Sequence, residues 1–233
     1  MGLDILVMPL SRYLSGRFQS PLEQALGSAV ERVGSAKPSN DAATVAEHVA
    51  ALKERLLREA GAEDAPWDEA SEPAWTGQYH YRAYTDLRAF AAHQDYPRTK
   101  GWFSKEIVPF REEEDVSRYQ GLLAVLNKGK PTSFPHLIVH ADTHGYWVPL
   151  RFKAPLIVDR ENYFVVGSSV LLLEELDRLG KLLGMTRDWG ELSSGETAAA
   201  KDDPLGSVKY GWSVLHHAAR TSVKRRMPII FDG

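Results

Sequence analysis

The chain has 233 residues, of which 43% are hydrophobic and 25% are charged, a composition typical of globular proteins with a sizeable buried core. Its 28 Lys and Arg residues nearly balance 31 Asp and Glu residues, so the composition predicts no general attraction to nucleic acid or anionic lipid. The absence of cysteine excludes disulfides, thiolate metal sites and a thiol nucleophile.

The N-terminal segment and the apolar runs bear on location. The chain begins Met-Gly-Leu-Asp, with no basic run before a short apolar stretch, which argues against a signal peptide. The longest apolar runs, such as 170–173, fall far short of the roughly 20 residues that a membrane span needs. We therefore expect a soluble, cytoplasmic protein.

The first half of the chain predicts two strands and three helices. A short run rich in Ile, Leu and Val predicts a buried first strand. Ser-Pro and Asn-Asp pairs are typical helix starts, and apolar residues at three- and four-residue steps follow both. The expected order is strand 3–10, helix 20–33, a helix that Asn40 or Asp41 caps, strand 78–84 and helix 85–94.

The second half is expected to begin with a helix, 112–126, that stops before Gly129 and Pro131. A turn at 142–145 between two apolar runs predicts a β-hairpin. A leucine-rich helix follows the next strand, and a helix and an edge strand end the chain. The expected order after the first helix is strands 136–141 and 146–152, strand 162–166, helix 170–183, helix 208–226 and strand 227–231.

These elements predict an α+β fold with a mainly antiparallel sheet and about five or six helices packed on it. We expect a single globular domain over residues 1–233, with irregular insertions near 61–77, 95–110 and 190–207. The first insertion is acidic and is interrupted by Pro66 and Pro73.

The pattern His140-x-Asp142-x-His144 is the feature of this sequence that most resembles a metal-binding or catalytic site. Residues two apart on a strand share a face, so an imidazole and a carboxylate could begin a two-His-one-carboxylate metal site. Alternatively, Asp142 and Gly145 are turn residues and the two histidines have no shared role. We expect no bound metal on this second interpretation.

Ser168 and Ser169 lie between a predicted strand and a predicted helix. Backbone N–H groups and hydroxyls there could surround a phosphate or carboxylate. The alternative is that a serine caps the helix, and no nucleotide-binding fingerprint supports the anion site.

Several aromatic residues lie in or beside predicted loops, where they would suit a protein interface. The alternative is that the loops fold back and bury them. The candidate interface residues are Trp67, Trp75, Tyr79, Tyr81 and Trp102.

The last helix ends in the basic residues Arg220, Lys224, Arg225 and Arg226. Cations at a helix C-terminus complement the helix dipole, which accounts for them without a ligand.

The segments 140–152 (HADTHGYWVPLRF) and 166–176 (VGSSVLLLEEL), together with the Met-Gly-Leu-Asp start, resemble a group of small bacterial proteins. The resemblance covers about a fifth of the chain. It implies a bacterial cytosolic domain and assigns no catalytic residue, because those proteins have no established activity.

The sequence indicates a non-enzymatic bacterial protein that binds another protein, of the immunity or accessory type, because aromatic and acidic loops occur without an assembled catalytic motif. The alternative is a metal- or anion-dependent enzyme that uses His140, Asp142 and His144. No cofactor is expected. The expected partner is another protein rather than a membrane or nucleic acid, and no small-molecule ligand is assigned.

Overall fold

The computed structural model describes residues 2–16, 41–63, 65, 67–100, 104–126, 129–140, 145–159, 161, 163–186 and 203–232. Within them the chain forms, in order, β1 (Gly2–Val7), α1 (Leu10–Leu14), α3 (Ala42–Glu59), β2 (Trp75–His80), α4 (Tyr81–Asp95), α5 (Glu112–Leu126), α6 (Pro135–Ile138), β3 (Gly145–Val148), β4 (Leu156–Asp159), β5 (Phe164–Ser168), α7 (Ser169–Leu183), α9 (Gly206–Arg225) and β6 (Ile229–Asp232).

The six described strands form one sheet in the order β2-β1-β6-β3-β5-β4. Neighbouring strands run antiparallel except β3 and β5, which are parallel. The expected α+β class with a mainly antiparallel sheet is therefore confirmed.

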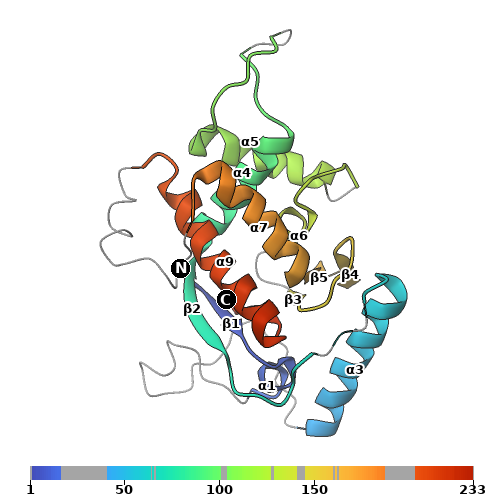
Figure 1. The fold of residues 1–233 in the computed structure, drawn as a ribbon. Helices are drawn as coiled ribbons and strands as arrows, with labels where there is room; N and C mark the ends of the chain where they lie inside the picture. Colours follow the sequence, from blue (N-terminus) through green and yellow to red (C-terminus); the bar gives the residue numbers. More distant parts are fainter. Residues whose placement is uncertain are drawn as a thin grey trace.

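Helices cover both faces of the sheet because its strands are apolar on both sides. Along β1, Leu3, Ile5 and Val7 belong to one hydrophobic cluster and Leu6 to the other, as expected for side chains that alternate across a strand. The larger cluster includes residues of α4, α5, α6, α7 and α9, and the smaller one includes Leu10 of α1 and Leu56 of α3. Figure 1 shows α7 and α9 side by side, with α3 apart from them.

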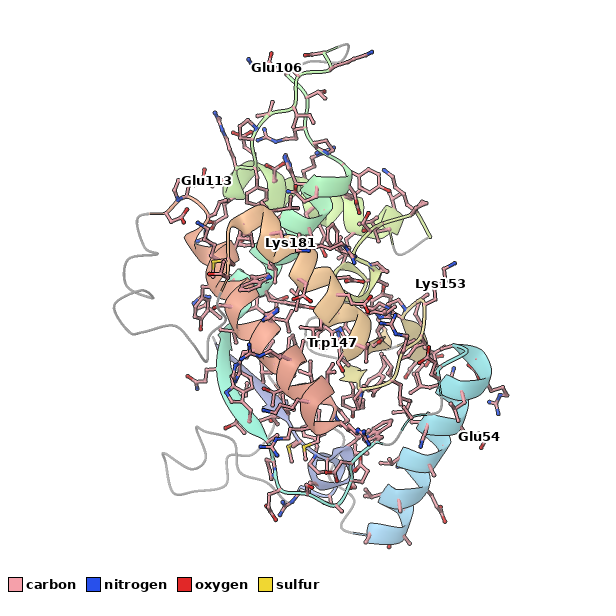
Figure 2. All side chains as sticks on the ribbon, in the orientation of Figure 1. Glu54, Glu106, Glu113, Trp147, Lys153 and Lys181 are labelled. Carbon is pink, nitrogen blue, oxygen red and sulfur yellow. The ribbon has the colours of Figure 1, made fainter. Side chains whose placement is uncertain are left out.

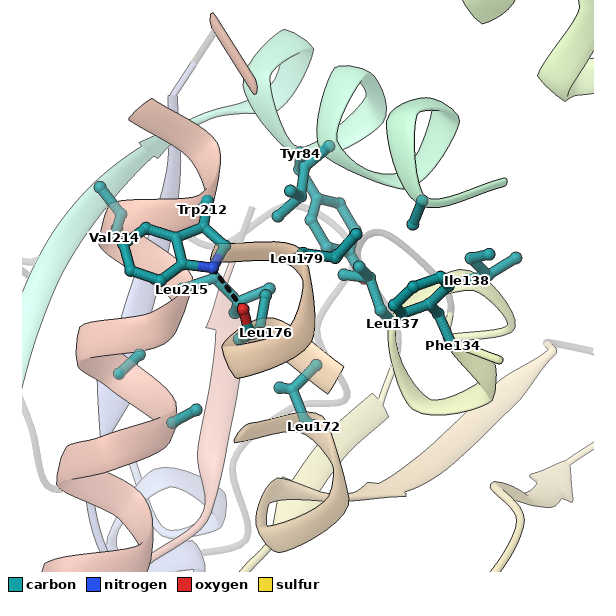
Figure 3. Close-up of a cluster of buried hydrophobic side chains, with 14 of the residues drawn as sticks. Tyr84, Phe134, Leu137, Ile138, Leu172, Leu176, Leu179, Trp212, Val214 and Leu215 are labelled. Atoms are coloured by element: carbon teal, nitrogen blue, oxygen red, sulfur yellow. Dashed lines mark hydrogen bonds between the residues drawn. The ribbon is translucent and has the colours of Figure 1, made fainter. Parts of the chain in front are cut away.

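The packing of α9 on α7 depends on a tryptophan. The Trp212 indole N–H donates to the Leu176 carbonyl at 2.6 Å (Figure 3). A Cβ added at Gly180 would lie 2.6 Å from the Trp212 ring, so a glycine is required for this close approach. Trp147 of β3 lies in the middle of the molecule (Figure 2) and is fully buried.

Several predicted elements are confirmed with close boundaries. α5 has the expected bounds, and Asp41 caps α3 by accepting hydrogen bonds from the N–H groups of Ala43 and Thr44. Ser168 caps α7, and Gly184 ends it in the left-handed region at φ 66°. The predicted helix 20–33 and most of the insertion 190–207 lie outside the described residues.

The predicted hairpin is wrong. Residues 135–138 form the short helix α6, which begins at a proline, and β3 pairs with β5 and β6 rather than with a strand just before it. The last strand is not an edge strand, because β6 lies between β1 and β3. β4, which pairs with β5, was not expected from the sequence. Within the described residues, no helix combines the length and apolar character needed to cross a bilayer.

Candidate functional site

The predicted polar patch is buried where the structure describes it. His140 has no exposed surface, and its ring stacks on Trp147 with centroids 3.5 Å apart. Its Nε2 atom lies 3.2 Å from the Tyr146 carbonyl oxygen. Asp142 and His144 lie outside the described residues. Among those described, no group of three or more His, Asp or Glu side chains could hold a metal ion.

Ser168 and Ser169 are also fully buried. The Ser168 hydroxyl accepts a hydrogen bond from the Leu171 N–H at 3.1 Å, which is the helix-capping role that the sequence left open. The Ser169 hydroxyl donates to the Val148 carbonyl at 3.2 Å and accepts from Ser222 at 2.8 Å. Ser168 therefore caps α7, and Ser169 joins α7 to β3 and α9.

His136 and Glu175 form a buried polar pair that the sequence analysis did not identify. The Glu175 carboxylate accepts hydrogen bonds from the N–H groups of His136, at 3.0 Å, and Leu137, at 2.9 Å. Burial lowers the pKa of His136 to about 4 and raises the pKa of Glu175 to about 8. Neither side chain has more than 3% of its surface exposed, so this pair holds α6 on α7.

The predicted interface aromatics have different surroundings. Trp67 is half-buried against the smaller hydrophobic cluster, and Trp75 packs on the larger one with its ring 5.1 Å from that of His217. Tyr81 is 45% exposed at the start of α4. Tyr79 belongs to β2, but its side chain lies outside the described residues, as does Trp102.

The chain around residue 68 is unusually acidic. No Lys or Arg occurs between residues 59 and 81. Within this stretch we call residues 63–72 the acidic segment. Its acidic residues are Glu63, Asp64, Asp68, Glu69 and Glu72, of which Asp64 lies outside the described residues.

Backbone N–H groups hold two carboxylates of the acidic segment. Glu69 accepts hydrogen bonds from the N–H groups of Leu10, at 3.1 Å, and Ser11, at 2.7 Å, at the start of α1. Asp68 accepts bonds from the Ser71 hydroxyl and from the N–H groups of Ala70 and Ser71, and these bonds lower its pKa. Such bonds fix a carboxylate in place without cancelling its charge.

The remaining described carboxylates of the acidic segment are exposed. Glu63 lies at the surface beside Arg151, whose backbone carbonyl accepts the Glu63 N–H at 3.0 Å. Glu72 forms an ion pair with Arg12, and its side chain is 83% exposed. In the described part of the chain this is the one ion pair of the acidic segment, so a local negative charge remains.

The acidic segment contacts the C-terminal end of α9. The Asp68 N–H donates to the Arg226 carbonyl at 2.8 Å. Lys224, Arg225 and Arg226 are exposed there, and we call them the basic end of α9.

Comparisons with known proteins identify a family. No curated protein and no solved structure matches the chain. One protein-family model, described as "Putative DNA-mimic protein", matches residues 1–231.

This match corrects two expectations. The sequence predicted an immunity or accessory protein, or else a metal- or anion-dependent enzyme. That prediction is wrong, because the description of the matching family says that its members mimic DNA. The partner expectation set nucleic acid aside because the total charge is nearly balanced, and that part is wrong for the same reason, whereas a protein partner is compatible with a DNA mimic. A charge total does not show how charges are distributed over a surface. Since the match covers almost the whole sequence, the chain belongs to this DNA-mimic family.

Proposed function

We propose that this protein binds a DNA-binding protein in place of DNA, and that the acidic segment presents carboxylates where the partner normally meets phosphates. Family membership supports the class of activity. The observation that carries the location is the stretch 59–81, which has six acidic residues and no Lys or Arg. Proteins neutralise DNA phosphates with Lys and Arg, so carboxylates without an arginine partner suit the same surface. Among the described residues of the acidic segment these are Glu63, Asp68 and Glu69, since Glu72 pairs with Arg12.

The proposal requires a local surface, because the formal net charge of the whole chain is only −3. Asp68 and Glu69 suit this role because backbone N–H groups hold their carboxylates in fixed positions. A fixed charge loses less side-chain entropy on binding than a mobile one. The exposed carboxylate of Glu63 extends the charge outward, and the exposed pair of Glu72 with Arg12 lies at the end of the acidic segment.

Tyr81 is the predicted interface residue that this proposal retains as a direct contact. It follows β2 at the end of the stretch without Lys or Arg, and it is 45% exposed. Aromatic side chains at the border of a charged surface add buried area on binding. We also propose a cytoplasmic location, where DNA-binding proteins would be accessible.

Displacement from immobilised double-stranded DNA tests the proposal. Host proteins that bind the DNA at about 0.1 M salt are treated with the purified chain, and the eluted proteins are identified. We expect the chain to release one or a few proteins that free DNA also releases. The double variant Glu63→Gln/Glu72→Gln should release less, because it removes two exposed carboxylates and leaves the Arg12 cation without its partner, while no bond to the backbone is lost.

The matched control is Glu47→Gln/Glu113→Gln, which removes two exposed charges from α3 and α5. It should behave like the natural chain. Release of no DNA-binding protein by the natural chain would refute the proposed function, and equal losses in both variants would refute the role of the acidic segment.

A further inference from the structure

The basic end of α9 differs from the other basic residues at the surface. Lys224, Arg225 and Arg226 are exposed, and none of them forms an ion pair with a carboxylate of the described chain. Many other arginines are paired with acidic residues of the same chain. Those pairs join Arg12 to Glu72, Arg55 to Glu59, Arg58 to Glu54, Arg82 to Glu112, Arg98 to Asp115, Arg111 to Glu114 and Arg151 to Glu174.

The helix dipole explains only part of this arrangement. It favours cations in the last turn of α9, by about 0.3–1 kcal/mol each at an exposed site. It does not explain why three exposed cations occur at the end of α9 that contacts the acidic segment, without an ion pair to a described carboxylate of that segment. Asp68 and Glu69 are instead bonded to backbone N–H groups, and Glu72 is bonded to Arg12.

The acidic segment and the basic end are neighbours in space. The Asp68 N–H bond to the Arg226 carbonyl joins them at 2.8 Å. Figure 1 shows this end of α9 near the chain that leads into β2, in agreement with that bond. A partner that covers the acidic segment would therefore meet the cations as well.

A DNA duplex presents phosphates on both strands and no cations of its own. A partner with a uniformly basic surface would be repelled by the basic end, and like charges brought together at an interface cost several kcal/mol. We propose, on the basis of the proposed function, that the basic end is a specificity element. It selects a DNA-binding protein whose basic surface is bordered by carboxylates.

This arrangement would solve a problem that DNA imitation creates. A purely phosphate-like surface attracts any protein that binds the DNA backbone, because that attraction does not depend on sequence. Discrimination requires a feature that favours one partner and repels the others. Lys224 and Arg225 supply both effects if the chosen partner has acidic residues opposite them.

Charge reversal in the full-length chain tests this inference. The variant is Lys224→Glu/Arg225→Glu, with Arg226 unchanged because it ends α9 in the left-handed region at φ 58°. Its matched control is Lys105→Glu/Lys181→Glu, which reverses two exposed lysines elsewhere. Affinity is measured for the protein released from DNA and for poly-L-lysine, a uniformly basic probe.

We expect the α9 variant to bind the released protein about tenfold more weakly than the control does, since attraction becomes repulsion. Poly-L-lysine should be bound more tightly by the α9 variant than by the control, because the repelling cations are gone. Equal or tighter binding of the released protein would overturn the inference while leaving the proposed function intact. If the natural chain displaces no protein from DNA, both proposals fail together. Matching circular dichroism and melting temperatures would establish that both variants are folded.

Discussion

The two most acidic regions of the described chain hold their charges in different ways. In the first turn of α5, Glu112 pairs with Arg82, and Asp115 and Glu114 both pair with Arg98. In the acidic segment, Asp68 and Glu69 are held mainly by backbone N–H groups. An arginine cancels the charge that it fixes, whereas a backbone N–H group does not.

Carboxylates that pair with arginines stabilise the fold, whereas those held by backbone N–H groups keep a negative charge that a partner can bind. The α5 carboxylates fix the ends of the segment between α4 and α5, which projects from one end of the molecule (Figure 1). The acidic segment keeps its negative charge at the opposite end. A count of acidic residues alone would have treated the two regions as equivalent.

The largest effect is expected at Asp115, which is 97% buried. Its carboxylate accepts bonds from Arg98 Nε at 2.9 Å and from the Arg111 N–H at 2.8 Å, and it lies 3.2 Å from His93 Nδ1. Asp115→Ala should lower the free energy of unfolding by about 3 kcal/mol, because buried donors lose their acceptor.

Urea denaturation measures this loss. Glu113→Ala in the same turn is the control and should change stability by less than about 0.5 kcal/mol. A loss below about 1 kcal/mol at Asp115 would contradict its assigned structural role.

Glu175 also accepts backbone N–H bonds, which lower its pKa, but its carboxyl group is buried, and the effect of burial is larger and raises the pKa. Its pKa is raised from 4.5 to about 8, so the folded protein keeps a proton that the unfolded chain releases. The stabilisation is therefore complete below about pH 4.5 and is lost as the pH rises to about 8. Between pH 6.5 and 8 the loss should be about 2 kcal/mol, at 1.36 kcal/mol per pH unit.

Thermal or urea unfolding at several pH values, with Glu175→Gln as the comparison, checks this dependence. The variant should lose most of the slope in that interval. His136 does not interfere there, because its pKa is lowered to about 4 and its contribution changes only below about pH 6.5. An unchanged slope in the variant would assign the pH dependence to another group.

The smallest of these effects concerns Glu69, which caps the start of α1. Glu69→Ala should lower stability by about 1 kcal/mol, as the loss of a helix cap does. Glu72→Ala is the control, since its pair with Arg12 is exposed and should contribute little. If both variants are equally stable, Glu69 is not fixed in the way that its bonds indicate.

Local sequence patterns predicted most of the long described helices, but α1 and α6 were not expected, and α4 begins at Tyr81, inside the predicted strand 78–84. α7 depends on the capping residues Ser168 and Gly184 and on apolar periodicity within its own segment, and both α5 and α7 appear close to the predicted bounds. The predicted hairpin is wrong because residues distant in the sequence decide the structure of this region. Glu175 holds the N-terminal N–H groups of α6, and β3 finds its partners in β5 and β6.

The candidate site was predicted less well than the fold. The sequence predicted a functional polar patch near a turn. The structure shows instead that His140, Ser168 and Ser169 are buried and hydrogen-bonded within the fold. The acidity of the stretch 61–77 is visible in the sequence. The role of these acidic residues could not be predicted, because it depends on which carboxylates pair with arginines and which accept bonds from backbone N–H groups in the folded chain.

Competition with DNA measures whether the chain occupies the DNA-binding surface of its partner. A fluorescently labelled duplex is bound to the protein released from immobilised DNA, and the purified chain is titrated in while anisotropy is followed. We expect that the natural chain displaces the duplex, that Glu63→Gln/Glu72→Gln does so less effectively and that Glu47→Gln/Glu113→Gln is unchanged. Simultaneous binding of the duplex and the natural chain to the partner would refute the proposed function.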